Sequence, residues 1–317
     1  MINKKQYIIL SFLLTRVLFL GGGISLLIGI SNNTLMLNSF LGMLLGYFLL
    51  YLFYKKGSIN KLWEIIIAIF TLSIVWLDDT ILTSTYLLYN TPPFLILIIL
   101  VIVSLFGIKK EMKVIGRSSE IFIGFSFIVY LFMLISLPSL IHLNNLLPFF
   151  KTNFTSFIKG IIVFTGASLT PNLMLLKYKD NLKFKDVSIG YILGCLSIIF
   201  IIFDILGIYG GDFASILRFP EYLILKKINI LDYISNVENI LIMEWIINII
   251  IGSLFCSKVL KDDLNKRSFV LILIGIFILV NNFLNRNYIY ILYVKAYSYY
   301  IFFGTILLGL IWKGRKR

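Results

Sequence analysis

An apolar run at residues 7–30, YIILSFLLTRVLFLGGGISLLIGI, sets the first constraint on the fold of this chain. In a helix, about 24 residues at roughly 1.5 Å each reach across the hydrocarbon core of a bilayer, which is about 30 Å thick. Yet the run holds Arg16 near its middle and three consecutive glycines, Gly21, Gly22 and Gly23. Each glycine costs about 1 kcal/mol relative to alanine in a helix interior. Backbone that leaves the helix inside a bilayer is tolerated only where protein buries it or where it lines a wet cavity. The run therefore predicts a membrane-spanning helix that breaks beside a binding cavity.

Composition places the whole chain among membrane proteins. Of its 317 residues 59% are hydrophobic and 14% are charged, which excludes a soluble domain. The pattern predicts an all-α polytopic membrane protein, a single transmembrane domain over residues 1–317 with about ten transmembrane helices. The apolar segments lie at about residues 7–30, 34–54, 62–89, 93–108, 119–140, 156–176, 187–208, 234–257, 268–284 and 289–312.

Lysine and arginine concentrate in alternate loops between these segments. In a soluble protein the net charge of +14 would suggest a nucleic-acid partner. Here the basic residues sort by side of the membrane, so the expected environment is the lipid bilayer and no nucleic acid is expected. The positive-inside rule predicts that both termini are cytoplasmic and counts Lys295 among the outer residues.

The sixth segment carries a second interruption, TGASLTP at residues 165–171. Glycine weakens a helix, and proline removes a backbone donor. Two broken helices five segments apart predict an inverted 5+5 repeat of the LeuT-like kind, with helices 1 and 6 broken, repeat one at about 7–140 and repeat two at about 156–312. In the alternative interpretation, these small residues only allow close helix packing.

Exposed half-helix ends favour particular ligands. Free N–H groups at the positive end of a helix dipole attract a carboxylate, and free C=O groups attract an ammonium group or a cation, so a zwitterionic amino acid satisfies both. The predicted ligand-binding residues are Gly21, Gly22, Gly23, Ser25, Asp78, Thr165, Gly166, Ala167, Ser168 and Thr170.

Ionisable residues inside the bilayer are costly and are candidates for coupling. Asp78 and Asp79 lie in the outer half of the third segment, either in a water-filled vestibule or in contact with a ligand or cation. Arg16 needs a partner, for which Glu244 and Asp78 are the hypotheses; the alternative is water and carbonyl groups. Asn248 lies on the same helix face as Glu244, four residues on. Asp204 is expected near the outer surface and in water.

The sequence gives little support to an enzyme. The chain has one histidine, His142, in an outer loop, with no acidic residue in the seven positions after it. It has no glycine-rich phosphate loop, and neither a metal site nor a cofactor is expected.

Four short stretches, in this order, resemble the B-subunit family of endospore germinant receptors, which belong to the amino acid/polyamine/organocation superfamily. The first is INKKQ at residues 2–6, before the apolar run. The second, GRSSE at residues 116–120, is similar to the family's G-x-R-x-x-E entry to the fifth span. The third is NLLP at residues 145–148. The fourth is RFPEY at residues 218–222, continued by residues 228–232 and 238–245.

This resemblance implies a ten-span permease fold with a pocket lined by the first, third, sixth and eighth helices. It implies a role in spore germination, in which the protein senses a small nutrient, often an amino acid, together with the receptor's A and C subunits. A self-sufficient amino-acid or cation-coupled transporter is the alternative function, and a purely structural subunit is a third possibility.

Overall fold

The computed structural model is all-α in the part of the chain that it describes, residues 2–20, 22–57, 60–148, 150, 152–179, 182–227, 237–284, 286 and 288–311. Seven helical segments in that part are long and apolar enough to cross a membrane, judged by length and composition. The α-helices are α1 (Lys4–Arg16), α2 (Gly23–Ser31), α3 (Leu35–Lys56), α4 (Lys61–Leu82), α5 (Pro93–Gly107), α6 (Met112–Ser136), α7 (Phe154–Leu175), α8 (Phe184–Tyr209), α9 (Gly211–Ile216), α10 (Pro220–Leu225), α11 (Val237–Asp263), α12 (Lys266–Leu284) and α13 (Tyr288–Ile311).

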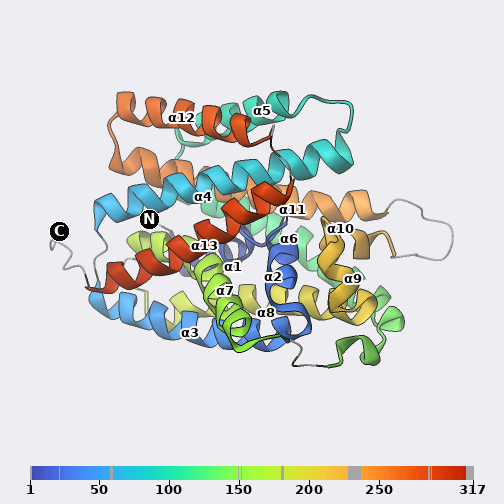
Figure 1. The fold of residues 1–317 in the computed structure, drawn as a ribbon. Coiled ribbons are helices and arrows are strands. Elements are labelled where there is room, and N and C mark those ends of the chain that lie inside the picture. The colour runs from blue at the N-terminus through green and yellow to red at the C-terminus, as the bar shows by residue number, and fades with distance from the viewer. Residues whose placement is uncertain are drawn as a thin grey trace.

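The first apolar run is divided into two helices at the centre of the bundle. Helices α5 and α12 lie side by side at one edge and α3 and α8 at the opposite edge, with α1, α2 and α7 between them (Figure 1). Helix α1 contacts α6, α7, α8 and α11, and α2 contacts α7, α9, α10 and α13. Apart from α7, which contacts both halves, the two halves of the divided run have different neighbours, so a change at the division affects both sets.

The predicted break in the sixth segment is wrong, because α7 runs as one helix past Pro171. The side chains around the proline bond the carbonyl groups of the preceding turn: Thr170 Oγ1 donates to the Gly166 oxygen at 2.6 Å, and Asn172 Nδ2 donates to the Ser168 oxygen at 3.0 Å. Side-chain donors of this kind, together with neighbouring helices, satisfy backbone groups that proline and glycine would leave open in a membrane helix.

Helix α8 packs closely on α1 through a G-x-x-x-G pair, Gly190 and Gly194. A methyl group added at Gly190 would overlap the Ile8 carbonyl oxygen, and one at Gly194 would lie 2.6 Å from Thr15 Cβ. Small residues at both positions let the two backbones approach.

At one end of the bundle, α4, α7 and α11 are tied together by charge. Lys177 follows α7, and its Nζ lies 2.7 Å from Asp263 Oδ1 of α11 and 3.3 Å from Glu64 Oε2 of α4. A lysine between two carboxylates holds these three helix ends together.

Replacement of Gly190 by alanine tests the close contact. We expect Gly190→Ala to destabilise the protein by about 1–3 kcal/mol, because the added methyl meets backbone rather than a movable side chain. Gly124→Ala in α6 is the matched control, since nothing lies within 4 Å of its added Cβ. Thermal unfolding in detergent measures both. Equal midpoints for the two variants would contradict the packing account.

Candidate ligand site within the membrane bundle

The division between α1 and α2 forms because the backbone turns at Gly22. This residue has φ 113°, in the left-handed region that favours glycine, and precedes the first residue of α2. Its N–H donates to Glu221 Oε1 at 2.9 Å. Glu221 lies on the short helix α10 and is fully buried. A carboxylate therefore occupies the N-terminal end of α2, where the helix dipole favours negative charge.

The other side of the division is bonded as well. Tyr299 of α13 donates its hydroxyl to the Leu18 carbonyl oxygen at 2.8 Å, and the rings of Phe19 and Phe164 lie 5.0 Å apart. The expectation that this backbone is open to a ligand must therefore be modified. Its Gly22 N–H and Leu18 carbonyl groups are already bonded to the side chains of Glu221 and Tyr299.

A buried ion pair lies near the division. Lys295 Nζ of α13 is 2.5 Å from Asp78 Oδ1 of α4, and the two side chains are 3% and 2% exposed. Lys295 is therefore inside the bundle, and its assignment to the outer residues is wrong. Glu221 interacts electrostatically with both members of the pair, and Lys295 and Tyr299 are one turn apart on α13. We call Gly22, Asp78, Glu221, Lys295 and Tyr299 the break cluster.

The break cluster keeps unused acceptor capacity. Within the described residues, Asp78 Oδ2 and Glu221 Oε2 are buried and have no hydrogen-bond partner. Asp79 is also buried, and Thr83 Oγ1 approaches its Oδ1 at 3.5 Å. Buried acceptors of this kind are rare in proteins and indicate a place for a further donor.

Arg16 forms a bidentate ion pair with Glu244, which is the first of its two hypothesised partners. Its Nη1 and Nη2 lie 2.7 and 3.0 Å from the two carboxylate oxygens of Glu244. The guanidinium carbon lies 5.1 Å from the ring centroid of Phe12 and 5.0 Å from that of Tyr130, and Ser126 donates to Glu244 Oε1 at 2.7 Å. The pair is fully buried and joins α1 to α11.

Several predicted site residues face other helices. Thr165 donates to the Gly42 oxygen of α3 at 3.1 Å, and Ser168 lies 3.1 Å from the Tyr191 hydroxyl of α8. Gly166 faces α13, because an added Cβ would lie 2.7 Å from the Tyr299 carbonyl oxygen. The structure thus spreads the α7 residues over three neighbours. Ala167 is buried, and Thr170 bonds its own helix.

The remaining predicted residues lie around the division and on α11. Ser25 donates to the Gly22 oxygen at 3.0 Å, and Gly23 lies against the Leu18 carbonyl group. Gly21 is outside the described residues. Asn248 is buried, and neither of its amide atoms has a partner within the described residues.

Sequence reasoning missed Glu221, Lys295 and Tyr299 as site residues. Glu221 stands in the RFPEY stretch, where a buried acid beside a proline was a usable signal, but no spacing relates it to Gly22. The prediction that Asp204 is in water is wrong: its side chain is fully buried, and neither carboxylate oxygen has a partner within the described residues.

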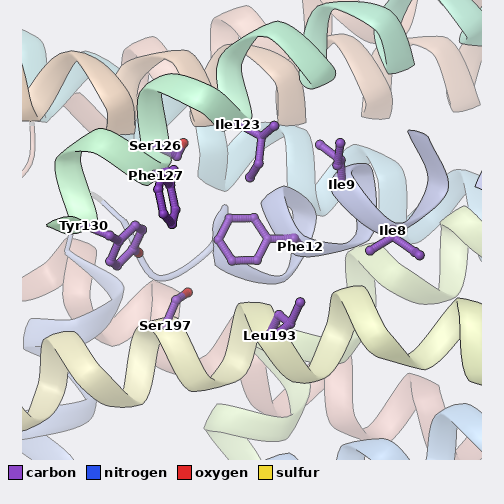
Figure 2. Close-up of a pocket in the computed structure, with 9 residues that line it drawn as sticks. All are labelled: Ile8, Ile9, Phe12, Ile123, Ser126, Phe127, Tyr130, Leu193 and Ser197. Atoms are coloured by element: carbon purple, nitrogen blue, oxygen red, sulfur yellow. The ribbon is translucent and has the colours of Figure 1, made fainter. Parts of the chain in front are cut away.

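Two apolar crevices flank the central helices. One, of about 300 Å³, lies between α1, α6 and α8, whose side chains face one another across it (Figure 2). The other, of about 240 Å³, lies between α4, α12 and α13 and is lined by Ile69, Phe70, Ser73, Ile74, Leu77, Leu279, Val280, Phe283, Lys295 and Ser298. The second crevice reaches the break cluster, since Lys295 belongs to both. Among the described residues, no group of three or more His, Cys, Asp or Glu side chains is placed to hold a metal ion.

Two comparisons with known proteins both indicate spore germination. A family model described as spore germination protein matches residues 29–289. A protein of Bacillus subtilis (strain 168), YfkT, whose name assigns it to spore germination, is 24% identical over 160 residues, 50% of this chain. The match covers 45% of the length of that relative.

The Arg16–Glu244 pair yields a stability prediction. Arg16→Met leaves the Glu244 carboxylate buried without its cation, which we expect to cost about 3–5 kcal/mol. Arg16→Met with Glu244→Met removes both charges and should recover most of that loss, and the exchange Arg16→Glu with Glu244→Arg should recover part of it. Thermal midpoints of the detergent-solubilised proteins measure each variant.

The control for this series is Lys4→Met, which breaks the Lys4–Asp186 ion pair, where the lysine side chain is 62% exposed. Water screens such a pair, so its loss should leave the midpoint unchanged. If Arg16→Met/Glu244→Met is no more stable than Arg16→Met alone, the cost of the single variant does not come from the unpaired Glu244 charge.

Proposed function

Because this chain belongs to the spore germination protein family, we propose that it is the membrane-embedded subunit of a spore germinant receptor and binds a small nutrient, an amino acid, at the break cluster. The observation that carries the proposal is the Glu221 carboxylate bonded to the Gly22 N–H group. It marks the N-terminal end of α2 as a carboxylate position inside the bundle.

Glu221 acts in this proposal as an internal competitor of the nutrient. The carboxylate of an amino acid offers the same acceptor oxygens and the same charge to the α2 N-terminus. Binding of the nutrient releases Glu221, and with it α10, which packs against α2, α8 and α11. The two states thus differ in the position of α10, and the nutrient has different affinities for them, as any ligand-driven shift requires.

The proposed architecture is a ten-span bundle of two inverted five-helix repeats with the site near the midplane. It is supported by the division of the first run, which falls about halfway along it, and by α5 and α13 as further apolar helices. The continuous α7 makes the second repeat differ from the first at the corresponding place. Cytoplasmic termini, an inner spore membrane and A and C partner subunits complete the proposal.

A self-sufficient amino-acid or cation-coupled transporter is the second candidate function. It is favoured by Asp204, which is buried and has no hydrogen-bond partner among the residues that the structure describes, because carboxylic acids inside a bundle are the usual proton carriers of transporters. Uptake of a labelled amino acid by the purified protein in vesicles would support transport. Its absence, with binding intact, would support the receptor.

Glu221→Gln tests the proposed competition. Glutamine keeps the size of the side chain but replaces a charge-assisted bond to Gly22 by a neutral one, so the internal competitor is weaker by about 1 kcal/mol. Spores that carry this variant should respond to the nutrient at about fivefold lower concentration. The measurement is the dose response of germination, with the nutrient identified by a scan of amino acids on wild-type spores.

Asp212→Asn on α9 is the matched control, because Asp212 is an exposed acid that bonds Asn32 at 2.8 Å. Its dose response should be unchanged. Gly22→Val should abolish the response while membrane insertion is retained, since valine is strained at φ 113°. An unshifted response of Glu221→Gln together with a normal one of Gly22→Val would refute the site, and wild-type germination after deletion of the gene would refute the receptor role.

A further inference from the structure

The break cluster contains more acidic than basic side chains. Asp78 and Glu221 bring two carboxyl groups to it, and Lys295, 2.5 Å from Asp78 Oδ1, brings one ammonium group. Asp78 uses one oxygen for this pair, and within the described residues its Oδ2 has no partner although it is buried. The group that such an oxygen lacks is a donor, and in this electrostatic setting a cationic donor is favoured over a neutral one.

The geometry distinguishes between two kinds of cation. A metal ion requires several ligand atoms around one point, and the described residues place no three His, Cys, Asp or Glu side chains in that way. A primary ammonium group needs less, because each of its N–H bonds can be directed to a separate acceptor. The break cluster therefore suits an ammonium group.

The crevice between α4, α12 and α13 provides room for the rest of such a molecule. Its volume is about 240 Å³, and its lining is apolar apart from Ser73, Lys295 and Ser298. Two of the lining residues, Ile74 and Leu77, belong to α4 and stand four positions and one position before Asp78. An apolar group in this crevice would leave the polar end of the molecule near Lys295, which lines the crevice and is paired with Asp78.

We infer that Asp78 binds the ammonium group of an amino acid whose aliphatic or aromatic side chain occupies the α4–α12–α13 crevice. This rests on the proposed function, because it names the nutrient's second charged group and its side chain. The carboxylate then takes the position of Glu221 at Gly22, and the ammonium group bonds Asp78 Oδ2 while Lys295 keeps Oδ1.

Three probes of matched shape test the assignment: leucine, 3-methylbutylamine, which lacks the carboxylate, and 4-methylpentanoate, which lacks the ammonium group. Calorimetry on the full-length protein in lipid nanodiscs measures their binding. We expect 4-methylpentanoate to bind at least about tenfold more weakly than leucine, the usual loss for a missing charge-assisted hydrogen bond. The amine should bind measurably.

The variant that removes the ammonium acceptor is Asp78→Asn combined with Lys295→Met, so that no lysine is left buried without its carboxylate. This double variant should bind leucine and the amine at least about tenfold more weakly than the wild-type protein does. Its affinity for 4-methylpentanoate should be unchanged. Asp79→Asn, one position along α4, is the control, and it should leave the affinities for all three probes unchanged. Elution as a single species and an unchanged thermal midpoint establish that each variant is folded.

Leu279→Trp tests the crevice separately. Leu279 lines the crevice but is 47% exposed, so the larger ring can be accommodated while it fills part of the space. Leucine should bind more weakly and glycine, which has no side chain, should bind as before.

The outcomes separate this inference from the proposed function. Equal binding of leucine and 4-methylpentanoate, unchanged by the Asp78→Asn/Lys295→Met double variant, overturns the ammonium assignment but leaves the carboxylate position at Gly22 in place. No binding of the amine to the wild-type protein overturns it as well. Leucine binding that is unaffected by Gly22→Val removes the proposed site itself.

Discussion

The structure depends on one requirement, that backbone polar groups within a bilayer find partners inside the protein. At the division between α1 and α2 the helix cannot supply them, and each unsatisfied group would cost several kcal/mol in hydrocarbon. The Gly22 N–H group bonds Glu221, and the Leu18 carbonyl group accepts from Tyr299. These two bonds tie α10 and α13 to the centre of the bundle. The break is therefore a junction of four segments rather than a defect in one helix.

The buried charges follow the same requirement. Arg16 meets Glu244 through two hydrogen bonds, and Lys295 meets Asp78 through one. A buried ion pair adds little net stability compared with apolar residues, but removal of one partner is costly. In the first pair both carboxylate oxygens of Glu244 are bonded, and the rings of Phe12 and Tyr130 lie against the Arg16 guanidinium group. These features fit a structural link between α1 and α11. In the second pair, Asp78 Oδ2 has no partner in the described part of the chain, which is why we assign binding to that pair and structure to the first.

The sequence predicts the helical membrane class and the first break because hydrophobicity and glycine are local signals. Gly22 takes a conformation that few other residues adopt, and its neighbours in the chain are enough to show this. The second break was predicted by the same local rule, and it fails because Thr170 and Asn172 bond their own helix. The sequence also narrows the candidate partners of Arg16 to two acids, Glu244 and Asp78. Glu221 could not be related to Gly22, since 199 positions separate them and only the folded bundle brings them together.

The two ends of the bundle differ in a way that bears on signalling. At the end where α4 begins and α11 finishes, Lys177 bridges Glu64 and Asp263, and charge holds three helices together. At the break, by contrast, α10 is a helix of six residues, and one hydrogen bond of 2.9 Å joins its Glu221 to the Gly22 N–H group; in the proposed function the nutrient's carboxylate replaces Glu221 in this bond. A ligand shifts a conformational equilibrium only by the difference in its affinity for the two states. The proposed competition for the Gly22 N–H group would supply such a difference directly, because the nutrient would gain this bond only in the state that Glu221 has left. In the proposed function, helix α10 is therefore the element whose displacement reports occupancy to a partner subunit, while Lys177 keeps the ends of α4, α7 and α11 joined.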